Sequence, residues 1–244
     1  MNDLWYIPPS DFLSRMSARD RATLLEAGTR RQFKKHDFIF QAGSPGENVY
    51  ALIDGRVKIY QLSGLGRETI LWFCFPGEVF GLAEIPRGGR REVYAQACSD
   101  STIVAIGKER FQRFLADTPP VAMLVIDLLS CRLRALGEML MNLSSDDATS
   151  RVIKLLIRLW ARYGSEMEGD IYLNITLTHQ EMADMIGTSR QTVTTVLNQL
   201  RRKDVLAVEN HRIHILRPDL LQAMIQEGPQ MMPVALGGHC ASAR

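Results

Sequence analysis

The chain has 244 residues, of which 46% are hydrophobic and 23% charged, and its formal net charge is +2. This length and composition allow two domains with apolar cores, and the charge balance excludes a protein that coats nucleic acid through bulk positive charge. The apolar run at residues 121–126 is far shorter than a membrane span, and residues 1–5 lack the basic and apolar segments of a leader. We therefore expect a cytoplasmic protein with no membrane partner.

The first part of the chain combines one short helix with several short β-type runs. We predict the helix at residues 20–28 and a series of strands between residues 31 and 106, each ended by turn residues. The runs lie at 37–40, 49–53, 57–60, 69–73 and 101–106. Regular alternation of strand and turn predicts a small barrel or sandwich. Gly55 and Gly64 fit hairpin turns, whereas Gly77 and Gly81 flank a segment where we expect the backbone to approach a ligand.

A long helix is predicted from residues 117–120 to Leu143. Its apolar residues recur in alternating steps of four and three, which is a heptad seam that needs a partner helix. The seam consists of Ala122, Ile126, Leu129, Leu133, Leu136, Leu140 and Leu143. A second stripe, Val121, Val125, Leu128, Ala135 and Met139, suits packing on the barrel. We favour a homodimer through the seam, with a core helix inside a monomer as the alternative.

Residues 144–149 interrupt this pattern and are predicted to form a hinge, followed by a helix at 150–163. Two short helices then follow, joined by a turn at Gly187. Thr178 and Glu181 form a capping box for the first helix, and Val193, Val196, Leu197 and Leu200 face inward from the second. Seven polar residues remain for contact with base edges and phosphates: Thr188, Ser189, Arg190, Gln191, Thr194, Thr195 and Asn198.

Two further runs, 205–208 and 213–216, predict a hairpin that turns at 209–212, which is the wing of a winged helix-turn-helix. Residues 227–244 are rich in glycine and show little periodicity, so we expect a mobile tail.

In this order the elements resemble the cyclic-AMP receptor protein and FNR (CRP/FNR) family of bacterial transcription regulators. The resemblance covers residues 10–220 and rests on five motifs, at 53–60, 66–71, 76–81, 147–152 and 187–193. It implies an α+β protein with a jelly-roll barrel of the cyclic-nucleotide-binding type, a long dimerisation helix and a winged helix-turn-helix. The implied domains are residues 1–118, 119–146 and 147–220, with a tail at 221–244.

The resemblance also implies an effector pocket between the barrel and the long helix. Members that bind cyclic nucleotides carry a glutamate for the ribose, an Arg-Ser pair for the phosphate and a Thr-Ser pair for the adenine. The matching positions here hold Leu82, Arg91-Glu92 and Leu136-Gly137, and Phe80 and Gly81 complete the expected pocket. Because Glu92 would repel a phosphate and the leucines offer no hydrogen bonds, we expect that cyclic AMP is not the effector. Arg90 is an alternative counterpart of the phosphate-binding arginine.

The residues with which other members of the family sense oxygen or bind haem are not matched in this sequence either. Oxygen sensors use an N-terminal cysteine cluster, whereas the cysteines here, Cys74, Cys98, Cys131 and Cys240, lie far apart with none before residue 74. Haem sensors place their histidine ligand near Ala83, and we expect His36 to lie on the surface. Lone cysteines in apolar segments are mostly unreactive core residues. No cofactor or metal is identified, and the effector stays unknown.

The resemblance implies a homodimer that binds double-stranded DNA at a palindromic operator with half-sites about one helical turn apart. It also implies that Arg190 matches the family's guanine-reading arginine, which contacts O6 and N7 of the base. Loops at residues 63–66 and 163–166 are candidates for contact with RNA polymerase by analogy with family activators. Two alternatives stay open: a ligand-binding regulatory module without DNA function, and a cyclic-AMP-dependent regulator. An enzyme is disfavoured, because no nucleophile triad, phosphate loop or metal-ligand spacing is present in the sequence.

Overall fold

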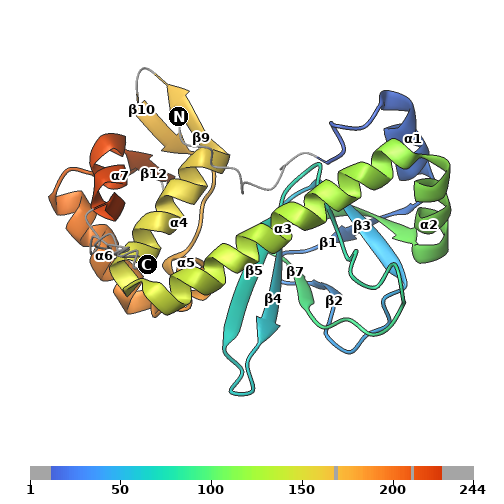
Figure 1. The fold of residues 1–244 in the computed structure, drawn as a ribbon, viewed down its shortest axis with the longest axis horizontal. Coiled ribbons are helices and arrows are strands. Elements are labelled where there is room, and N and C mark those ends of the chain that lie inside the picture. Colours follow the sequence, from blue (N-terminus) through green and yellow to red (C-terminus); the bar gives the residue numbers. More distant parts are fainter. Residues whose placement is uncertain (1–11, 168–169, 210–211, 227–244) are drawn as a thin grey trace, which may run out of the picture.

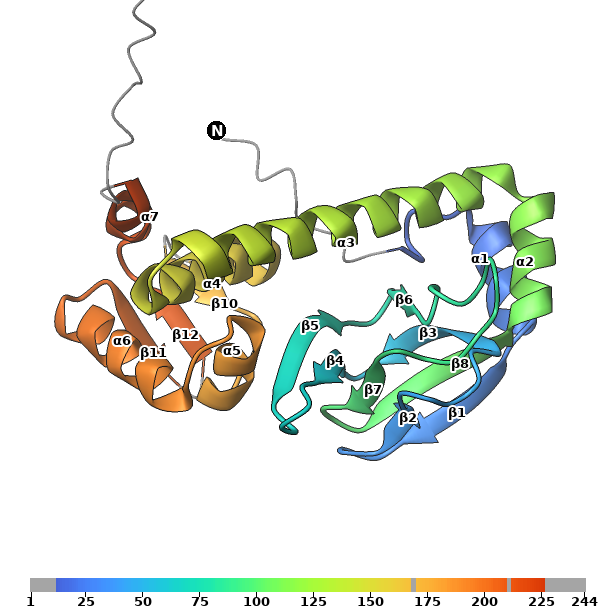
Figure 2. The ribbon, with the colours of Figure 1, turned by 60° about the horizontal axis from the view of Figure 1, so that its bottom comes forward.

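The computed structural model describes residues 12–167, 170–209 and 212–226. A single long helix, α3 (Pro119–Ser145), joins an N-terminal domain of two sheets to a C-terminal domain of helices with one small sheet. Figure 1 shows the two domains toward opposite ends of α3, and in Figure 2 both lie largely on the same side of that helix. The C-terminal domain folds back against the N-terminal domain, where helix α5 (His179–Met185) packs beside strand β5 (Glu68–Cys74).

Two facing sheets make up the N-terminal domain, and each has four antiparallel strands. The orders are β1-β8-β3-β6 and β2-β7-β4-β5. The strands are β1 (Thr29–Phe33), β2 (Phe38–Phe40), β3 (Asn48–Asp54), β4 (Val57–Leu62), β5 (Glu68–Cys74), β6 (Val79–Phe80), β7 (Tyr94–Ala97) and β8 (Ser101–Gly107). The five predicted strands are therefore present, while β1, β6 and β7 are additional. The sheets form a sandwich and not a closed barrel.

Strand β3 shows why the domain has two apolar layers. Val49 and Ala51 pack toward the helices, whereas Tyr50 and Leu52 point between the two sheets. Successive side chains of a strand face opposite sides, so a central strand that is covered on both sides is apolar at every position. The apolar layer between the two sheets forms part of the wall of the pocket described below.

Glycine is needed at the turn between β3 and β4, where Gly55 has a φ of 94°. The turn between β4 and β5 differs from the prediction, which gave the turn position to Gly64. Its left-handed residue is Gly66, with a φ of 76°, whereas Gly64 has no such backbone angle. The glycine that permits this hairpin is therefore Gly66.

Three helices cover the N-terminal domain: α1 (Ala18–Glu26), α2 (Lys108–Asp117) and the first half of α3. Helix α2 was not anticipated from the sequence. Val121, Val125 and Leu128 of α3 are buried against the sheet, as predicted for the second stripe. Among the described residues no single helix is long and apolar enough to cross a membrane, and only α2 and α3 taken together, bent by 115°, pass that test.

The junction between the domains is shorter than the predicted hinge at 144–149. Helix α3 continues to Ser145 and α4 (Ala148–Tyr163) begins two residues beyond Asp146. Asp147 caps α4, because its carboxylate accepts a hydrogen bond of 2.7 Å from the Ser150 amide. The interruption is therefore confined to two aspartates.

The C-terminal domain packs its helices around a four-stranded antiparallel sheet of order β11-β12-β10-β9. Its elements after α4 are β9 (Gly164–Met167), β10 (Asp170–Leu173), α5 (His179–Met185), α6 (Arg190–Arg202), β11 (Leu206–Glu209), β12 (Arg212–Ile215) and α7 (Pro218–Gln226). The segment 163–166, expected as a loop, is the end of α4 and the start of β9. Helix α7 crosses residue 220 and buries Leu221 in the core, so the tail expected from 221 overlaps a helix. Residues 227–244 lie outside the described residues.

Candidate DNA-binding surface and ligand pocket

Helices α5 and α6 form the predicted helix-turn-helix. The capping box of α5 is complete: the Glu181 amide donates to the Thr178 hydroxyl over 3.1 Å, and the Thr178 amide donates to the Glu181 carboxylate over 2.8 Å. Gly187 takes the left-handed conformation in the turn, with a φ of 62°. Ser189 then caps α6 by accepting a hydrogen bond of 3.0 Å from the Thr192 amide. Both helices therefore begin at residues whose side chains satisfy free backbone amides.

The two faces of α6 are separated as the pattern predicts. Val193, Val196, Leu197 and Leu200 are buried in the C-terminal core. Ser189, Arg190, Gln191, Thr195 and Asn198 are exposed, and Thr188 and Thr194 are partly exposed. A continuous polar face of this kind, carried on a rigid helix, can enter the major groove of DNA.

Thr194 is less available to DNA than its place on this face indicates. Its hydroxyl donates to the backbone oxygen of Arg190 over 2.9 Å and lies 2.8 Å from Nδ1 of His179. His179 also lines an open groove with Arg190 between α5, α6 and the wing strands. Sequence reasoning missed His179, although its position at the first turn of α5 was visible.

The wing is formed by β11 and β12, which pair antiparallel from Leu206 with Ile215 to Glu209 with Arg212. Its predicted turn includes Asn210 and His211, which lie outside the described residues. The wing strands extend the sheet that supports α6, as a winged helix-turn-helix requires.

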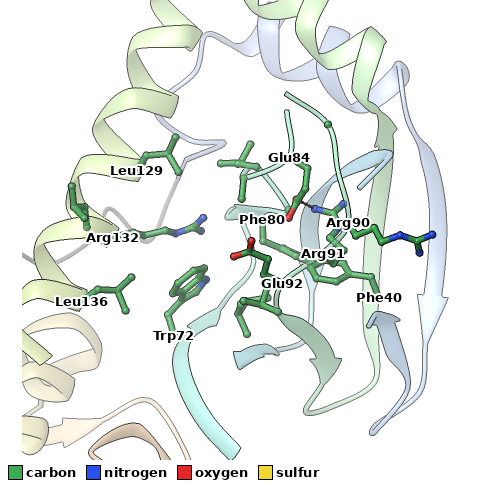
Figure 3. Close-up of a pocket in the computed structure, with 17 residues that line it drawn as sticks. Phe40, Trp72, Phe80, Glu84, Arg90, Arg91, Glu92, Leu129, Arg132 and Leu136 are labelled. Atoms are coloured by element: carbon green, nitrogen blue, oxygen red, sulfur yellow. Dashed lines mark hydrogen bonds and ion pairs between the residues drawn. The ribbon is translucent and has the colours of Figure 1, made fainter. Parts of the chain in front are cut away.

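A pocket of about 470 Å³ lies between the N-terminal sandwich and α3, and we call it the sheet–helix pocket. Six of the seven residues expected for an effector pocket line it: Phe80, Gly81, Leu82, Arg91, Glu92 and Leu136. Gly137 does not. Figure 3 shows Arg132, from α3, and Glu92, from the opposite wall, both pointing into the pocket. The seam residues Leu129 and Leu133 also line it.

Arg91 is not free to bind an anion in this pocket. Its guanidinium forms an ion pair with Glu84 and donates to the backbone oxygen of Asn48. It also stacks at 4.3 Å over the ring of Phe40. Glu84 was not anticipated, because no local pattern marks it as the partner of Arg91. The pair leaves the charge of Arg91 neutralised within the pocket wall.

Arg132 was also missed by the sequence reasoning. It is 7% exposed, it donates a hydrogen bond of 2.7 Å to the backbone oxygen of Val79, and it stacks at 4.9 Å over the ring of Trp72. Arg90, the alternative counterpart of Arg91, lines the same pocket and donates to the backbone oxygen of Gly43 over 2.6 Å. Charge in the pocket is therefore carried by Arg90, Arg132 and Glu92.

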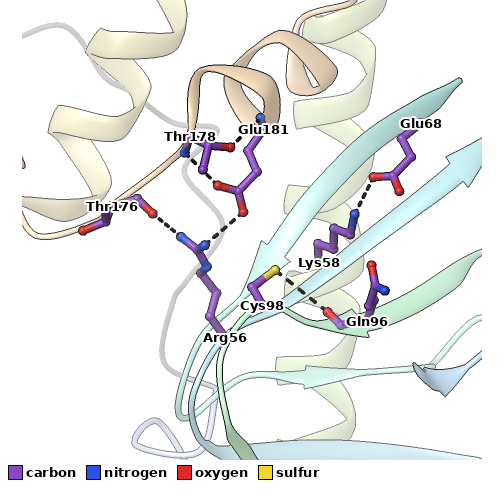
Figure 4. Close-up of polar contacts among 8 residues, drawn as sticks. All are labelled: Arg56, Lys58, Glu68, Gln96, Cys98, Thr176, Thr178 and Glu181. Atoms are coloured by element: carbon purple, nitrogen blue, oxygen red, sulfur yellow. Dashed lines mark hydrogen bonds and ion pairs between the residues drawn. The ribbon is translucent and has the colours of Figure 1, made fainter. Parts of the chain in front are cut away.

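The N-terminal domain contacts the helix-turn-helix directly (Figure 4). Arg56, in the turn between β3 and β4, pairs with Glu181 at 2.9 Å and donates to the backbone oxygen of Thr176. Arg67, in the hairpin between β4 and β5, donates to the backbone oxygen of Thr188. These contacts link the first domain to both ends of α5.

Burial disfavours the reactive thiolate form of two described cysteines, Cys74 and Cys98. Cys74 is fully buried, and burial raises the pKa of its thiol to about 12. Burial also raises the pKa of Cys98. His36 is exposed, as expected. Within the ranges that the structure describes, no three His, Cys, Asp or Glu side chains lie close enough to hold a metal ion.

Comparison with known proteins identifies both domains. A model of the cyclic nucleotide-binding domain matches residues 30–118, and a model of the Crp-like helix-turn-helix domain matches residues 150–224. The chain is 30% identical to the global nitrogen regulator of Synechococcus elongatus over 189 residues, covering 77% of this chain and 85% of that protein.

A second regulator is similar in sequence, and one solved structure is similar in fold. The CRP-like cAMP-activated global transcriptional regulator of Mycobacterium tuberculosis is 29% identical over 194 residues, which cover 78% of this chain and 87% of that protein. Among solved structures, a mutant of CooA from Carboxydothermus hydrogenoformans aligns with a TM-score of 0.73 at 24% identity, covering 83% of this chain and 90% of that one.

Proposed function

Because the chain belongs to the CRP/FNR family and is a DNA-binding transcription regulator, we propose that it acts as a homodimer on a palindromic operator without control by cyclic AMP. Its relatives are transcription regulators and not enzymes. The exposed polar face of α6 is the observation that carries the DNA-binding part of the proposal. Arg190 reads a guanine in each half-site, and Ser189, Gln191, Thr195 and Asn198 contact neighbouring bases or phosphates.

Dimerisation is supported by the apolar row along α3. Ile126, Leu129, Leu133 and Leu140 are 55%, 43%, 72% and 68% exposed in one protomer. Exposed leucines at heptad spacing lose contact with water when two such helices pair, which stabilises the dimer by roughly 25 cal/mol per Å² of apolar surface buried. Two recognition helices then face half-sites about one helical turn apart.

The dimer is tested by sedimentation of the Leu133→Lys/Leu140→Lys variant. Both side chains are exposed in the protomer, so the substitutions should leave its fold intact while placing charges in the seam. We expect the double variant to be a monomer that binds a half-site weakly and shows no cooperativity on the full operator. Leu65→Lys is the matched control, because Leu65 is 98% exposed in the turn between β4 and β5. A dimer that survives the double substitution would contradict the proposal.

The effector pocket in this proposal is the sheet–helix pocket. Leu82 and Leu136 offer no hydrogen bonds to a ribose or an adenine, and Glu84 neutralises the arginine that matches the phosphate-binding position. A nucleotide would leave several polar groups unpaired there, at about 1–3 kcal/mol each. The relative from Mycobacterium tuberculosis is cAMP-activated. This chain shares the cyclic nucleotide-binding domain, but in our proposal its pocket wall does not suit a nucleotide.

Operator affinity with and without cyclic AMP tests this point. The operator is first selected from a random duplex pool with the purified protein, and binding is then measured at fixed salt, because phosphate contacts make affinity salt-dependent. We expect the same affinity in both conditions. A strong increase with cyclic AMP would overturn the assignment of the pocket.

Contact of the loop at 63–66 with RNA polymerase is part of the same proposal and is tested by transcription from that operator with Leu65→Lys.

A further inference from the structure

A second cavity lies between the two domains, apart from the sheet–helix pocket. It has a volume of about 100 Å³ and is bounded by β5, α3, α4 and the end of α5. Its walls are mostly apolar, with Phe73, Met139, Leu155, Tyr163 and Met185 among them. We call it the interdomain cavity. Its wall combines residues of the first domain, of α3 and of the second domain.

Arg158 of α4 stands out among its lining residues. It is half-buried, neither a hydrogen bond nor an ion pair joins it to any other residue in the described part of the chain, and desolvation lowers the pKa of its guanidinium to about 10. The other arginine of the cavity, Arg162, has a counter-ion: it pairs with Glu78 and stacks over the ring of Tyr163, although its Nε has no acceptor among the described residues. A cation in an apolar cavity costs several kcal/mol unless an anion compensates it.

An adjoining small cavity adds a second observation. It shares Arg158, Met139 and Met185 with the interdomain cavity and is also lined by Arg151. Nε of Arg151 is buried and has no acceptor within the described residues, although its Nη1 donates to the backbone oxygen of Asp146 over 2.9 Å. The guanidinium groups of Arg151 and Arg158, seven residues apart on α4, therefore face α3. Both have N–H donors without an acceptor among the described residues.

The carboxylates of α3 do not supply the missing acceptor. Asp127 pairs with Arg15 at 2.7 Å, far along the helix, and Glu138 interacts with Lys154. Nearer to the junction, Asp146 pairs with Lys154 at 2.7 Å.

We propose that the interdomain cavity is a binding site for a small organic anion, with a carboxylate held by Arg158 and a short apolar body between α3 and α4. The volume suits a compact acid and not a nucleotide, and the apolar walls favour an organic group over a fully hydrated inorganic ion. Because one ligand touches the helix of the first domain and the first helix of the second, its binding stabilises this arrangement of the domains. The site is a separate cavity from the sheet–helix pocket, although Trp72 lines both.

Benzoate is the probe, and its neutral analogue benzamide is the matched ligand. Calorimetric titration of the full chain measures binding directly, so the result does not depend on whether the chain recognises an operator. We expect benzoate to bind the wild type and benzamide to bind at least tenfold more weakly, because only the carboxylate compensates Arg158. Arg158→Met should reduce benzoate affinity at least tenfold, whereas Arg158→Lys, which keeps the charge, should lose less.

Two variants locate the probe. Arg113→Met removes an exposed arginine of α2 and should bind benzoate as the wild type does. Arg132→Met removes a cation of the sheet–helix pocket and should also keep full affinity. Loss of binding in Arg132→Met with none in Arg158→Met would place the anion in the other pocket and overturn the proposal. Equal binding of benzoate and benzamide, or no binding of benzoate to the folded wild type, would also overturn it.

Discussion

The guanidinium of Arg91 and the carboxylate of Glu84 form an ion pair in the wall of the sheet–helix pocket, where their side chains are 1% and 9% exposed. Gly81 makes room for this pair, because a Cβ at that position would lie 3.0 Å from Nη1 of Arg91. An arginine that matches a phosphate-binding position therefore serves as part of the scaffold. Because the pair is neutralised, the charges that a ligand meets in the pocket are those of Arg90, Arg132 and Glu92.

Glu84→Gln should destabilise the N-terminal domain by about 3–5 kcal/mol, because it leaves a buried guanidinium without its counter-ion. Removing both charges in Glu84→Gln/Arg91→Met should cost less than the sum of the two single substitutions. Urea unfolding of the four proteins measures this difference. Strictly additive free energies would mean that the two groups do not stabilise each other.

Gly55→Ala should lower the free energy of unfolding by about 2 kcal/mol or more. The residue has a φ of 94°, and an added Cβ would meet the backbone oxygen of Asp100 at 2.5 Å. Strain of this kind in a non-glycine residue costs about 1–3 kcal/mol, and the close contact adds to it. Gly64→Ala is the control, since nothing lies within 4 Å of its Cβ position, and it should change stability by less than about 0.5 kcal/mol. Similar losses in both variants, measured by thermal unfolding, would refute the argument.

The contact between Arg56 and Glu181 should couple the two domains. Their side chains are 19% and 17% exposed, so the pair is only partly screened and should contribute about 1 kcal/mol. A double-mutant cycle with Arg56→Met and Glu181→Gln isolates that energy, because glutamine can still accept the capping hydrogen bond of α5. Calorimetric unfolding should show the coupling. A coupling energy near zero would mean that the domains are held by their apolar contacts alone.

Local periodicity accounts for what could be predicted from the sequence. The two stripes of α3 repeat over several turns, so Val125 and Leu128 were assigned to the sheet and Leu133 to an open face. The capping box of Thr178 and Glu181 is equally local and placed the start of α5 correctly. Strands such as β3 were recognised because apolar residues lie between turn residues.

Long-range partners carry no such signal. Arg56 and Glu181 are 125 residues apart, and nothing near either residue indicates the other. Arg132 lies beside the heptad seam, where a charged residue predicts a solvated surface, yet the fold buries it against Trp72. Helix α2 was missed because its apolar positions continue directly from β8, and a strand pattern does not show where the chain changes period.

Asp147 should contribute a pH-dependent stability at the junction of the domains. The hydrogen bond from the Ser150 amide lowers the pKa of its carboxyl below the ordinary value of 3.8. A lowered folded-state pKa means that the stabilisation is fully present above the unfolded pKa and is lost as pH falls through the folded pKa. Asp147→Ala should therefore cost about 1 kcal/mol at neutral pH and progressively less below about pH 4. Asp147→Asn keeps a hydrogen-bond acceptor but does not titrate, so its free energy of unfolding in urea should lack this pH-dependent contribution. An undiminished cost of Asp147→Ala at low pH would contradict the assignment.

Arg190→Ala should weaken operator binding by about 1–3 kcal/mol for each half-site and relax the preference for one guanine. The side chain is exposed at the start of α6, where Ser189 holds the helix terminus in place, so its loss should not disturb the fold. Arg113→Ala, on the N-terminal domain, controls for the loss of one positive charge. Base preference is measured by selection from a random duplex pool with each variant. A uniform loss over all sequences would make Arg190 a phosphate contact, and an unchanged preference would assign the reading of that guanine to another side chain of α6.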